Sequence, residues 1–595
     1  MAIPANKLKP QSLQGLAVRH RLLIILLLIG FVVLFGRGIY LQGMAKEFLQ
    51  KQGEQRYYRN LKLSAKRGNI FDRNGNLLAS SQPVGSVWAN PKDVWKDWTK
   101  GVGNRLRQPP APYVQLNEDN LKRLATLLNM PILDLQKQLR KTHSGFVYLK
   151  HYLPPKQLDQ VMALRIYGID VQRDYKRYYP EIDVMSPIIG FTGLDDSGQE
   201  GIELFENDVL AGTDGSRRVL KNGAGNIIED VEAVKLPEDG KHLVLTIDKR
   251  IQYLAFRELG RAVEKYRALA GAAVVLDAKT GEVLAMANVP SYNPNADRSG
   301  KVRNRAITDV FEPGSTVKPF TAAVALEMGK YQPNSQIDTA PGTVKIGNRT
   351  IHDSHQHGVL TLAEIIQKSS NVGITKVALA LPAQAMWKFF RALGLGNKTR
   401  IEFPGEVSGR LMHYAAWHPI EQATISFGHG VNLTLLQLAR AYSVFANGGE
   451  LKPVSLLKSD VPAVGTQVFS APVAQQVKGM LEMAVLTGGT AVSAQILGYR
   501  VAGKTGTTKK LGVHGYERRY VSSFVGMVPA SNPRFIMAVM IDEPRSGDYY
   551  GGTVAAPVFS ATMSEVLRML SVPQDAPQHN VVIPSDDEDA KEDVL

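Results

Sequence analysis

The stretch Glu312-Pro-Gly-Ser-Thr-Val-Lys-Pro319 places a serine, Ser315, three residues before a lysine, Lys318. Residues three apart lie on one face of a helix, so the Lys318 amine can reach the Ser315 hydroxyl. Pro319 is best tolerated in a first helical turn, which puts Ser315 at or near the start of a helix. Because a serine hydroxyl needs an adjacent base, the spacing predicts Ser315 as a nucleophile and Lys318 as its base.

A lysine can act as a base only when its amine is neutral. The positive end of a helix, burial and a second ammonium group at Lys504 would each disfavour the charged form of Lys318. The predicted position of Lys318 therefore suits the chemistry.

Two further motifs follow the serine along the chain. They are Ser369-Ser-Asn371 and, on an apparent strand, Lys504-Thr-Gly-Thr507. Ser-x-x-Lys alone would fit an ordinary surface helix. All three motifs in this order resemble the signature of penicillin-binding proteins and serine β-lactamases. The resemblance implies acyl transfer through an acyl-serine.

The composition fits a large protein of several domains. The chain has 595 residues, enough for two to four domains, and 44% of them are apolar. With no cysteine, disulfides and thiolate metal sites are excluded. A formal charge of +15 favours anionic partners such as phospholipid headgroups, although a soluble basic surface explains it equally well. The sequence contains no basic motif with interleaved aromatic residues, so we predict no nucleic-acid partner.

The apolar segment from Leu22 to Leu41 predicts a transmembrane helix, since 20 helical residues span about 30 Å. Arg37 interrupts it near one end, where a long side chain can reach headgroups. Basic residues precede the segment and predict a cytoplasmic N-terminus: Lys7, Lys9, Arg19 and Arg21. A cleaved signal peptide and a buried soluble helix are the alternatives; the nearest small-x-small triplet, Gly43-Met-Ala45, makes a poor cleavage site.

Composition divides the chain further. We expect a cytoplasmic tail at 1–21, the membrane helix at 22–41, a stalk at 42–60, an extended non-catalytic pedestal at 61–236, a catalytic domain at 237–572 and an acidic disordered tail at 573–595. In the pedestal, Asn74-Gly75 predicts a tight turn. Its other glycines lack the strand-to-helix context of a nucleotide site.

The catalytic domain is predicted to be α/β (α+β), with one mixed sheet built from distant segments and helices on its faces. Ala272–Asp277 and Gly281–Ala287 indicate a hairpin. The remaining expected elements are helices at Ser315–Met328, Thr434–Asn447 and Ala555–Leu570, and strands at Arg500–Thr507, Ser522–Val528 and Phe535–Ile541.

Nearly the whole chain resembles the class B penicillin-binding proteins, and within them the division-specific septal branch. The stretches that carry the resemblance, beside the three motifs, are Arg67–Gly75, Arg177–Pro180, Gly190–Glu203, Pro290–Asn295 and Arg303–Glu312. The resemblance implies a penicillin-binding, β-lactamase-like transpeptidase domain behind a dimerisation-like pedestal and one membrane helix.

The resemblance also implies a reaction. Ser315 would attack the penultimate carbonyl of a peptidoglycan peptide stem ending in D-alanyl-D-alanine, and a neighbouring stem's amine would then take the acyl group. β-Lactams mimic that terminus and should acylate Ser315 without release. No cofactor is implied.

Other site residues are carried over from the same resemblance. Ser369 would relay the proton to the leaving amine, Asn371 would fix the substrate amide and Lys318, and Lys504 would support the relay. The hydroxyls of Thr505 and Thr507 would hydrogen-bond the substrate carboxylate, and Gly506 would let substrate lie close against the strand. The backbone N–H groups of Ser315 and Thr507 would form the oxyanion hole.

Histidines near the motifs have simpler interpretations. His352, His355 and His357 match no zinc spacing, so we interpret them as a loop near the active site and predict no metal. Ser426–Gly430 resembles the family's glycine-rich turn that lines the site. We do not expect His429 within it to be catalytic, because Lys318 already fills the role of the base.

The sequence is consistent with several functions. The first is septal transpeptidation at the inner (cytoplasmic) membrane, with a periplasmic catalytic domain. An elongation-specific class B transpeptidase, a D,D-carboxypeptidase or β-lactamase, and a non-catalytic divisome scaffold or β-lactam sensor are the alternatives. No glycosyltransferase domain is visible, so the resemblance implies a separate polymerase partner, FtsW, together with other division proteins.

Overall fold

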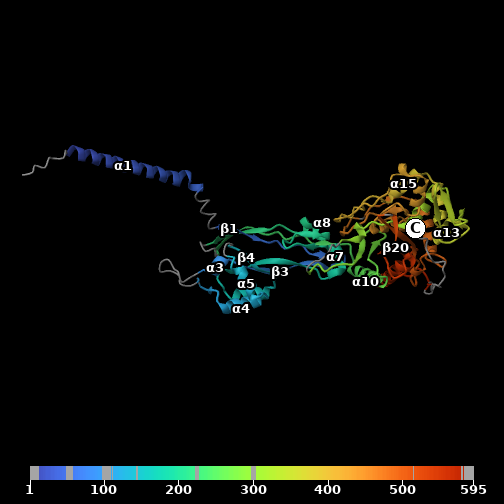
Figure 1. Ribbon diagram of the computed structural model, residues 1–595, viewed down its shortest axis with the longest axis horizontal. Coiled ribbons are helices and arrows are strands. Elements are labelled where there is room, and N and C mark those ends of the chain that lie inside the picture. The colour runs from blue at the N-terminus through green and yellow to red at the C-terminus, as the bar shows by residue number, and fades with distance from the viewer. Residues whose placement is uncertain are drawn as a thin grey trace, which may run out of the picture.

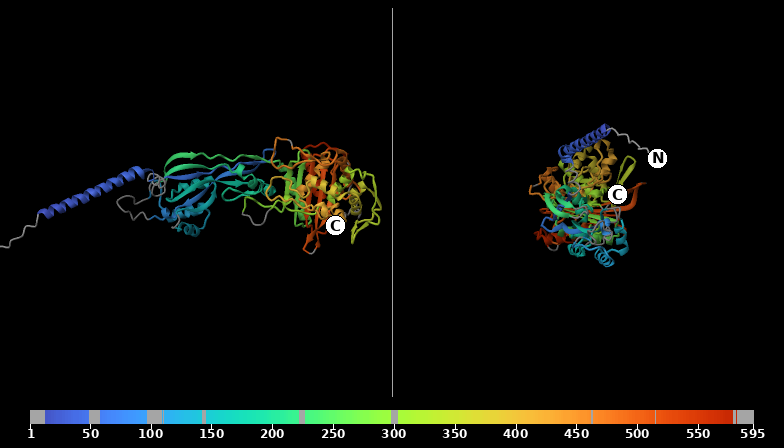
Figure 2. Two further views of the ribbon diagram at one scale, coloured as in Figure 1. Left: turned by 90° about the horizontal axis from the view of Figure 1, so that it is seen from above. Right: turned by 90° about the vertical axis from the view of Figure 1, so that its left-hand side faces the viewer.

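The computed structural model describes residues 13–48, 58–96, 109, 111–141, 145–221, 227–296, 303–461, 463–513, 515–577 and 581. These form an elongated chain with a long helix at one end, a pedestal in the middle and a larger C-terminal unit at the other end (Figure 1, Figure 2). Residues 49–57 of the predicted stalk and the acidic run Asp586–Asp589 lie outside the described residues.

The N-terminal helix is longer than the predicted apolar segment. Helix α1 (Leu13–Ile39) continues into a π-helical turn, η1 (Tyr40–Met44). The span Val18–Met44 is long and apolar enough to cross a membrane, and none of it is buried in the protein. The alternative of a buried soluble helix is therefore wrong. The Arg37 guanidinium lies 5.4 Å from the centre of the Tyr40 ring, near the end of the span.

The pedestal is built on two sheets. Strand β3 (Leu77–Ala89) pairs antiparallel with β2, β4 and β5, and β10 joins β2 in parallel. The second sheet is an antiparallel ribbon in the order β1-β8-β9. The bounds of these strands are β1 (Tyr58–Leu63), β2 (Ile70–Phe71), β4 (Val147–Leu153), β5 (Ile169–Tyr178), β8 (Gly215–Lys221), β9 (Ile227–Lys235) and β10 (Leu243–Val244).

The predicted turn at Asn74-Gly75 closes the β2–β3 hairpin. The Gly75 N–H donates to the Asp72 carbonyl at 3.1 Å. Gly75 has φ +82°, a conformation that favours glycine. The turn prediction is confirmed.

Short helices cover one face of the larger pedestal sheet with their apolar sides. Leu124 and Leu135 from these helices pack with Val87 and Leu149 from the strands in a small separate core. The pedestal helices and remaining short strands are α3 (Pro91–Val94), α4 (Glu118–Leu127), α5 (Ile132–Leu139), α6 (Pro155–Ala163), α7 (Ile182–Ile189), α8 (Gly201–Phe205), α9 (Asn207–Leu210), β6 (Phe191–Thr192) and β7 (Gly198–Glu200).

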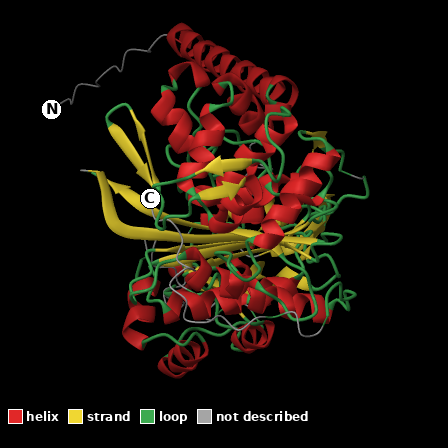
Figure 3. Cartoon of the chain, turned by 90° about the vertical axis from the view of Figure 1, so that its right-hand side faces the viewer, coloured by secondary structure: helices red, strands yellow, loops and turns green. Residues whose placement is uncertain are grey.

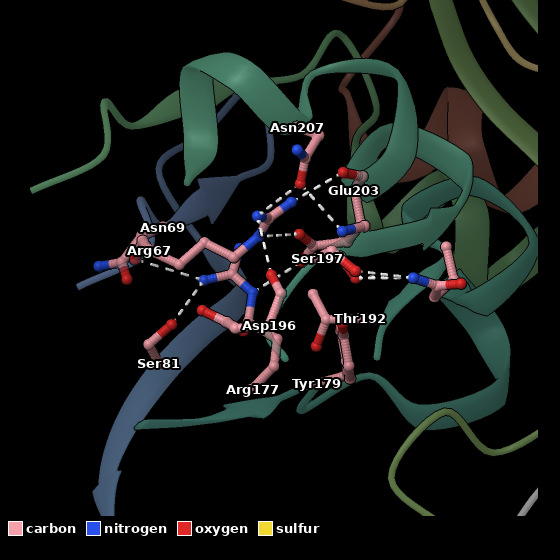
Figure 4. A network of polar contacts seen from close by, with 12 residues as sticks. Arg67, Asn69, Ser81, Arg177, Tyr179, Thr192, Asp196, Ser197, Glu203 and Asn207 are labelled. Carbon is pink, nitrogen blue, oxygen red and sulfur yellow. Dashed lines mark hydrogen bonds and ion pairs between the residues drawn. The ribbon is translucent and has the colours of Figure 1, made fainter. Parts of the chain in front are cut away.

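A buried ionic network joins the pedestal strands to α8. Both oxygens of the Glu203 carboxylate accept at 2.6 Å, one from Nε of Arg67 and one from Nε of Arg177 (Figure 4). Asn207 accepts from Arg67 at 2.9 Å, and Ser81 accepts from Arg177 at 3.1 Å. The two Arg67 contacts join segments that lie 136 and 140 residues apart in the chain, and the two Arg177 contacts join segments 26 and 96 residues apart.

The C-terminal unit is organised around a five-stranded sheet in the order β12-β11-β21-β20-β19. All of its pairings are antiparallel. Strand β11 (Ala270–Asp277) is buried along almost its whole length, as expected for an apolar run covered on both faces. With β12 (Val283–Val289) it forms the predicted hairpin.

Helices cover both faces of this sheet (Figure 3). Helices α10 (Lys249–Lys265) and α21 (Ala556–Met569) pack on one face. The larger set packs on the other and carries the site: α11 (Arg305–Thr308), α12 (Lys318–Glu327), α13 (Leu362–Lys368), α14 (Asn371–Leu379), α15 (Ala383–Ala392), α16 (Pro419–Ile425), α17 (Leu435–Ala441), α18 (Ser443–Ala446) and α19 (Ala471–Met483).

Small elements complete the unit: η2 (Gly314–Val317), η3 (Tyr414–Ala416), η4 (Val492–Ala494), α20 (Gly551–Val554), β13 (Gln336–Asp338), β14 (Thr343–Ile346), β15 (Arg349–His352), β16 (Val359–Thr361), β17 (Glu450–Leu451) and β18 (Thr466–Gln467).

Three predicted elements, two strands and one helix, differ from those observed. Strands β19 (Ala502–Gly512) and β20 (Gly515–Val528) extend well beyond the predicted Arg500–Thr507 and Ser522–Val528, since a polar hairpin carries them past the apolar part of the sheet. The predicted helix Thr434–Asn447 is divided at Tyr442 into α17 and α18. Strand β21 (Phe535–Asp542) and α21 lie where predicted.

Candidate active site

Ser315 lies in the 3₁₀ turn η2, immediately before α12, so its expected place at a helix start is confirmed. Pro319 stands in the first turn of α12. The Lys318 ammonium nitrogen lies 2.9 Å from the Ser315 hydroxyl oxygen. Both side chains are buried, with relative exposures of 1% and 0%. The predicted nucleophile and base are therefore in direct contact.

Ser369 connects the first lysine to the second. Its hydroxyl oxygen lies 3.1 Å from the Lys318 nitrogen and 2.9 Å from the Lys504 nitrogen. Lys318 also donates to the Ser369 carbonyl. The three motifs are thus brought together into one continuous polar chain running from Ser315 to Lys504.

The backbone places Ser369 at this junction in an unusual conformation. It ends α13 with φ +64°, in the left-handed region that non-glycine residues rarely adopt. Asp353, which the sequence analysis missed, holds the next residues: it accepts from the Ser370 hydroxyl at 2.6 Å and from the Val372 N–H at 2.8 Å. Asp353 lies 16 residues before Ser369, and no local sequence pattern indicated that the two would be close in the fold.

Asn371 begins α14 and is 1% exposed. Its side-chain amide donates to the His352 carbonyl at 3.3 Å. Its Oδ1 is buried and has no hydrogen-bond partner. A buried acceptor left unpaired is costly, so this oxygen is suited to receive an N–H from a bound molecule.

Strand β19 supplies the last motif. The Thr505 hydroxyl lies 2.8 Å from the Thr490 hydroxyl and accepts from Lys504 at 3.3 Å. The Thr507 hydroxyl accepts from the Gly551 N–H at 2.9 Å. Thr490 and Gly551 were not predicted from the sequence, because each approaches the motif only through the fold.

Gly506 has a packing reason to be glycine that the sequence did not reveal. A Cβ atom there would lie 2.6 Å from the Pro313 carbonyl oxygen and 3.0 Å from a Thr316 methyl carbon. The absence of a side chain lets the turn that carries Ser315 lie against β19. Its predicted role in admitting substrate stays a prediction.

The histidines occupy different places. His352 ends β15, and the His355 and His357 rings lie 6.2 Å apart in the loop that follows. Among the residues that the structure describes, no group of three or more histidine, aspartate or glutamate side chains could hold a metal ion. His429 packs against the Tyr516 ring, with 4.7 Å between ring centres.

This arrangement can activate a serine and transfer an acyl group. A neutral Lys318 can take the Ser315 proton, and the Ser369 hydroxyl can pass a proton on to a leaving group. Ser315, Lys318, Ser369 and Lys504 are all buried, and burial strengthens each of these interactions relative to water.

Family models match two parts of the chain. Residues 271–564 match the penicillin binding protein transpeptidase domain, and residues 62–245 match the penicillin-binding protein dimerisation domain. The predicted domain boundaries themselves stay predictions.

Individual relatives match over nearly the full length. The chain is 41% identical to peptidoglycan D,D-transpeptidase FtsI of Escherichia coli strain K12, over 94% of this chain and 93% of that protein. It is 40% identical to the probable peptidoglycan D,D-transpeptidase PenA of Neisseria gonorrhoeae, over 95% of this chain and 94% of that one. A crystal structure of a peptidoglycan synthetase from Bifidobacterium adolescentis is 28% identical, with a TM-score of 0.69, and covers 88% of this chain and 99% of its own.

Proposed function

The chain belongs to the class B penicillin-binding proteins, and on that premise we propose that it cross-links peptidoglycan at the division septum through an ester on Ser315. Its enzyme class, peptidoglycan D,D-transpeptidase, follows from the family. What the proposal adds is the covalent intermediate, the role of each residue and the place of action.

The contact between Lys318 and Ser315 carries the mechanism. The mechanism uses Lys318 in its neutral form as the base; its side chain is buried and shares the Ser369 hydroxyl with Lys504. Lys318 takes the proton as the Ser315 oxygen attacks the penultimate D-alanine carbonyl. The C–N bond then breaks, the leaving amine receives a proton through Ser369, and D-alanine departs.

The second half of the reaction reverses these steps with a new amine. An amine of a neighbouring stem attacks the ester carbon, its proton passes back through the same groups, and Ser315 regains its hydroxyl. The oxyanion formed in each half would lie between the backbone N–H groups of Ser315 and Thr507, each worth about 3 kcal/mol. The unpaired Oδ1 of Asn371 suits the substrate amide.

The carboxylate of the terminal D-alanine needs donors and positive charge. Lys504 and the hydroxyls of Thr505 and Thr507 lie together along β19 and supply both. β-Lactams present a carboxylate and a reactive carbonyl in a similar arrangement, so they should acylate the same serine.

The decisive experiment is mass spectrometry of the full-length protein in detergent after exposure to benzylpenicillin. One adduct per chain on Ser315 is expected, and Ser315→Ala should abolish it while leaving the melting temperature almost unchanged. An adduct on another residue, or one that persists in Ser315→Ala, would exclude the mechanism.

The proposed topology places α1 across the inner membrane with the N-terminus in the cytoplasm and the rest in the periplasm. The length and apolar character of Val18–Met44 and the basic residues before Leu22 support this. A reporter that works only outside the cytoplasm should be active when fused after residue 60. Purified protein that begins beyond Gly43 would indicate a cleaved signal peptide instead.

The septal assignment rests on similarity to FtsI along nearly the whole chain. With that assignment we propose septal partners, the glycan polymerase FtsW and other division proteins, because no glycosyltransferase motif was found in the sequence. Co-purification of FtsW with the full-length protein from membranes tests this partnership, and its absence after mild cross-linking would count against it.

A further inference from the structure

A second polar cluster lies beside the nucleophile turn. Its centre is the carboxylate of Glu312, three residues before Ser315. This carboxylate accepts from the Gly430 N–H at 2.9 Å and from the Tyr516 hydroxyl, which lies 3.1 Å from both of its oxygens. The Nδ1 atom of His429 lies 3.4 Å from Oε2 of Glu312.

The three side chains come from three separate parts of the fold. Glu312 precedes η2, His429 follows α16, and Tyr516 lies near the tip of the β19–β20 hairpin. The His429 ring packs on the Tyr516 ring at 4.7 Å. Burial and the neighbouring Glu312 carboxylate raise the pKa of Tyr516, so its hydroxyl stays protonated and available to donate.

Backbone contacts beside this cluster depend on the same placement. The Glu312 carbonyl accepts from the Thr508 hydroxyl at 3.0 Å, and the Gly314 N–H donates to the Gly428 carbonyl at 3.3 Å. Gly428 and Gly314 approach so closely that a Cβ on Gly428 would lie 2.2 Å from the Gly314 carbonyl oxygen. The nucleophile turn is therefore held between β19 and the turn around Gly428.

We propose that Glu312, Tyr516 and His429 form a latch that holds the β19–β20 hairpin against the nucleophile turn and so positions the two oxyanion donors, the N–H groups of Ser315 and Thr507. This inference rests on the proposed acyl-serine mechanism and deepens it. The latch residues are positioning residues. Ser315 and Thr507 belong to different segments, and the hydroxyls of Thr508 and Tyr516 bond the hairpin to Glu312 in the turn.

The latch has a kinetic signature distinct from that of a substrate-binding group. Small displacements of catalytic groups slow the chemical step much more than they weaken initial binding. We therefore expect Tyr516→Phe, which keeps the ring but removes the hydroxyl, to slow acylation of Ser315 about tenfold. That loss is smaller than the roughly 100- to 1,000-fold effect of deleting an oxyanion donor.

The test is a double-mutant cycle in the full-length protein in detergent. Acylation by a fluorescent penicillin is followed at several concentrations, which separates the dissociation constant of the initial complex from the acylation rate constant. The variants are Glu312→Gln, Tyr516→Phe and the double variant, with Tyr253→Phe on the exposed face of α10 as the matched control.

The latch predicts that each single variant lowers the acylation rate constant, that initial binding changes less than twofold, and that the double variant is no slower than the slower single. Melting temperatures near that of the parent will show that folding is intact. Acylation by Tyr516→Phe at the rate of Tyr253→Phe, or fully multiplicative losses in the double variant, would overturn the latch while Ser315 labelling leaves the proposed function standing. Absence of Ser315 labelling in the parent would overturn both.

Discussion

The Lys318 nitrogen lies 2.9 Å from the Ser315 hydroxyl oxygen, and both side chains are buried. The same nitrogen donates to the Ser369 carbonyl and lies 3.1 Å from the Ser369 hydroxyl. A compact primary amine can satisfy all three contacts at once. A planar guanidinium, which is larger and stays protonated, cannot.

Lys318→Arg should therefore retain a positive charge but lose the base. We expect acylation of Ser315 by benzylpenicillin to slow by about 100- to 10,000-fold, the usual contribution of a general base. Stopped-flow or gel-based labelling measures the rate. Lys388→Arg, on the exposed side of α15, is the matched control and should acylate normally. Near-normal acylation by Lys318→Arg would move the base elsewhere, with Lys504 as the next candidate.

The buried pedestal network predicts a large effect on stability. Glu203 faces Arg67 and Arg177, and the carboxylate is fully buried. Glu203→Gln leaves two buried guanidinium groups without their counter-charge, so the free energy of unfolding of the pedestal should fall by about 3–5 kcal/mol. Denaturant titration followed by pedestal tryptophan fluorescence measures the change.

A surface ion pair provides the control for that prediction. Asp119 and Arg123 form an exposed pair one helical turn apart on α4. Asp119→Asn should cost less than about 1 kcal/mol. Equal losses in Asp119→Asn and Glu203→Gln would mean that the buried network does not stabilise the pedestal.

Asp196 predicts how stability depends on pH. Burial raises its pKa to about 6, against the opposing attraction of Arg67 and Arg177 and with smaller support from Glu203. The folded protein therefore binds a proton more tightly than the unfolded chain. This group's contribution to stability is greatest below pH 3.8 and is lost as pH rises to about 6.

Asp196→Asn replaces the carboxyl group whose ionisation lowers the stability of the folded protein as pH rises. Relative to the parent, the variant should gain about 1–3 kcal/mol of unfolding free energy between pH 4 and pH 8, as a pKa difference of about two units allows. Denaturant titrations of both proteins at the two pH values measure it. A variant-minus-parent difference that does not change with pH would show that Asp196 does not titrate as described.

The central sheet and the catalytic motifs could be predicted from sequence because their signals are local. The apolar run of β11 and the spacing of Ser315 and Lys318 are each signals from residues that are neighbours in the chain. When the three motifs are assigned to one site, that assignment also predicts that Ser369 and Lys504 are buried.

Other features could not be predicted because they depend on contacts between distant segments. Asp353 reaches Ser370 only through the loop after β15, and Tyr516 reaches Glu312 across 204 residues. The left-handed conformation of Ser369 is stabilised by that surrounding structure, whereas serine itself has no preference for it. The extended β19–β20 hairpin is polar at its tip, so apolar periodicity does not mark its full length.

Depletion and localisation experiments distinguish a septal from an elongation-specific role, which the active-site motifs do not distinguish. The discriminating stretches are the pedestal and Arg303–Glu312, and we expect the pedestal to contact partners through surfaces remote from Ser315. Depletion of the protein should stop division while side-wall growth continues, so that cells form filaments, and a fluorescent fusion should collect at midcell. Ser315→Ala should still collect there, since placement and chemistry use different surfaces. Rounded cells after depletion, or uniform labelling of the side wall, would favour the elongation branch and leave the catalytic proposal intact.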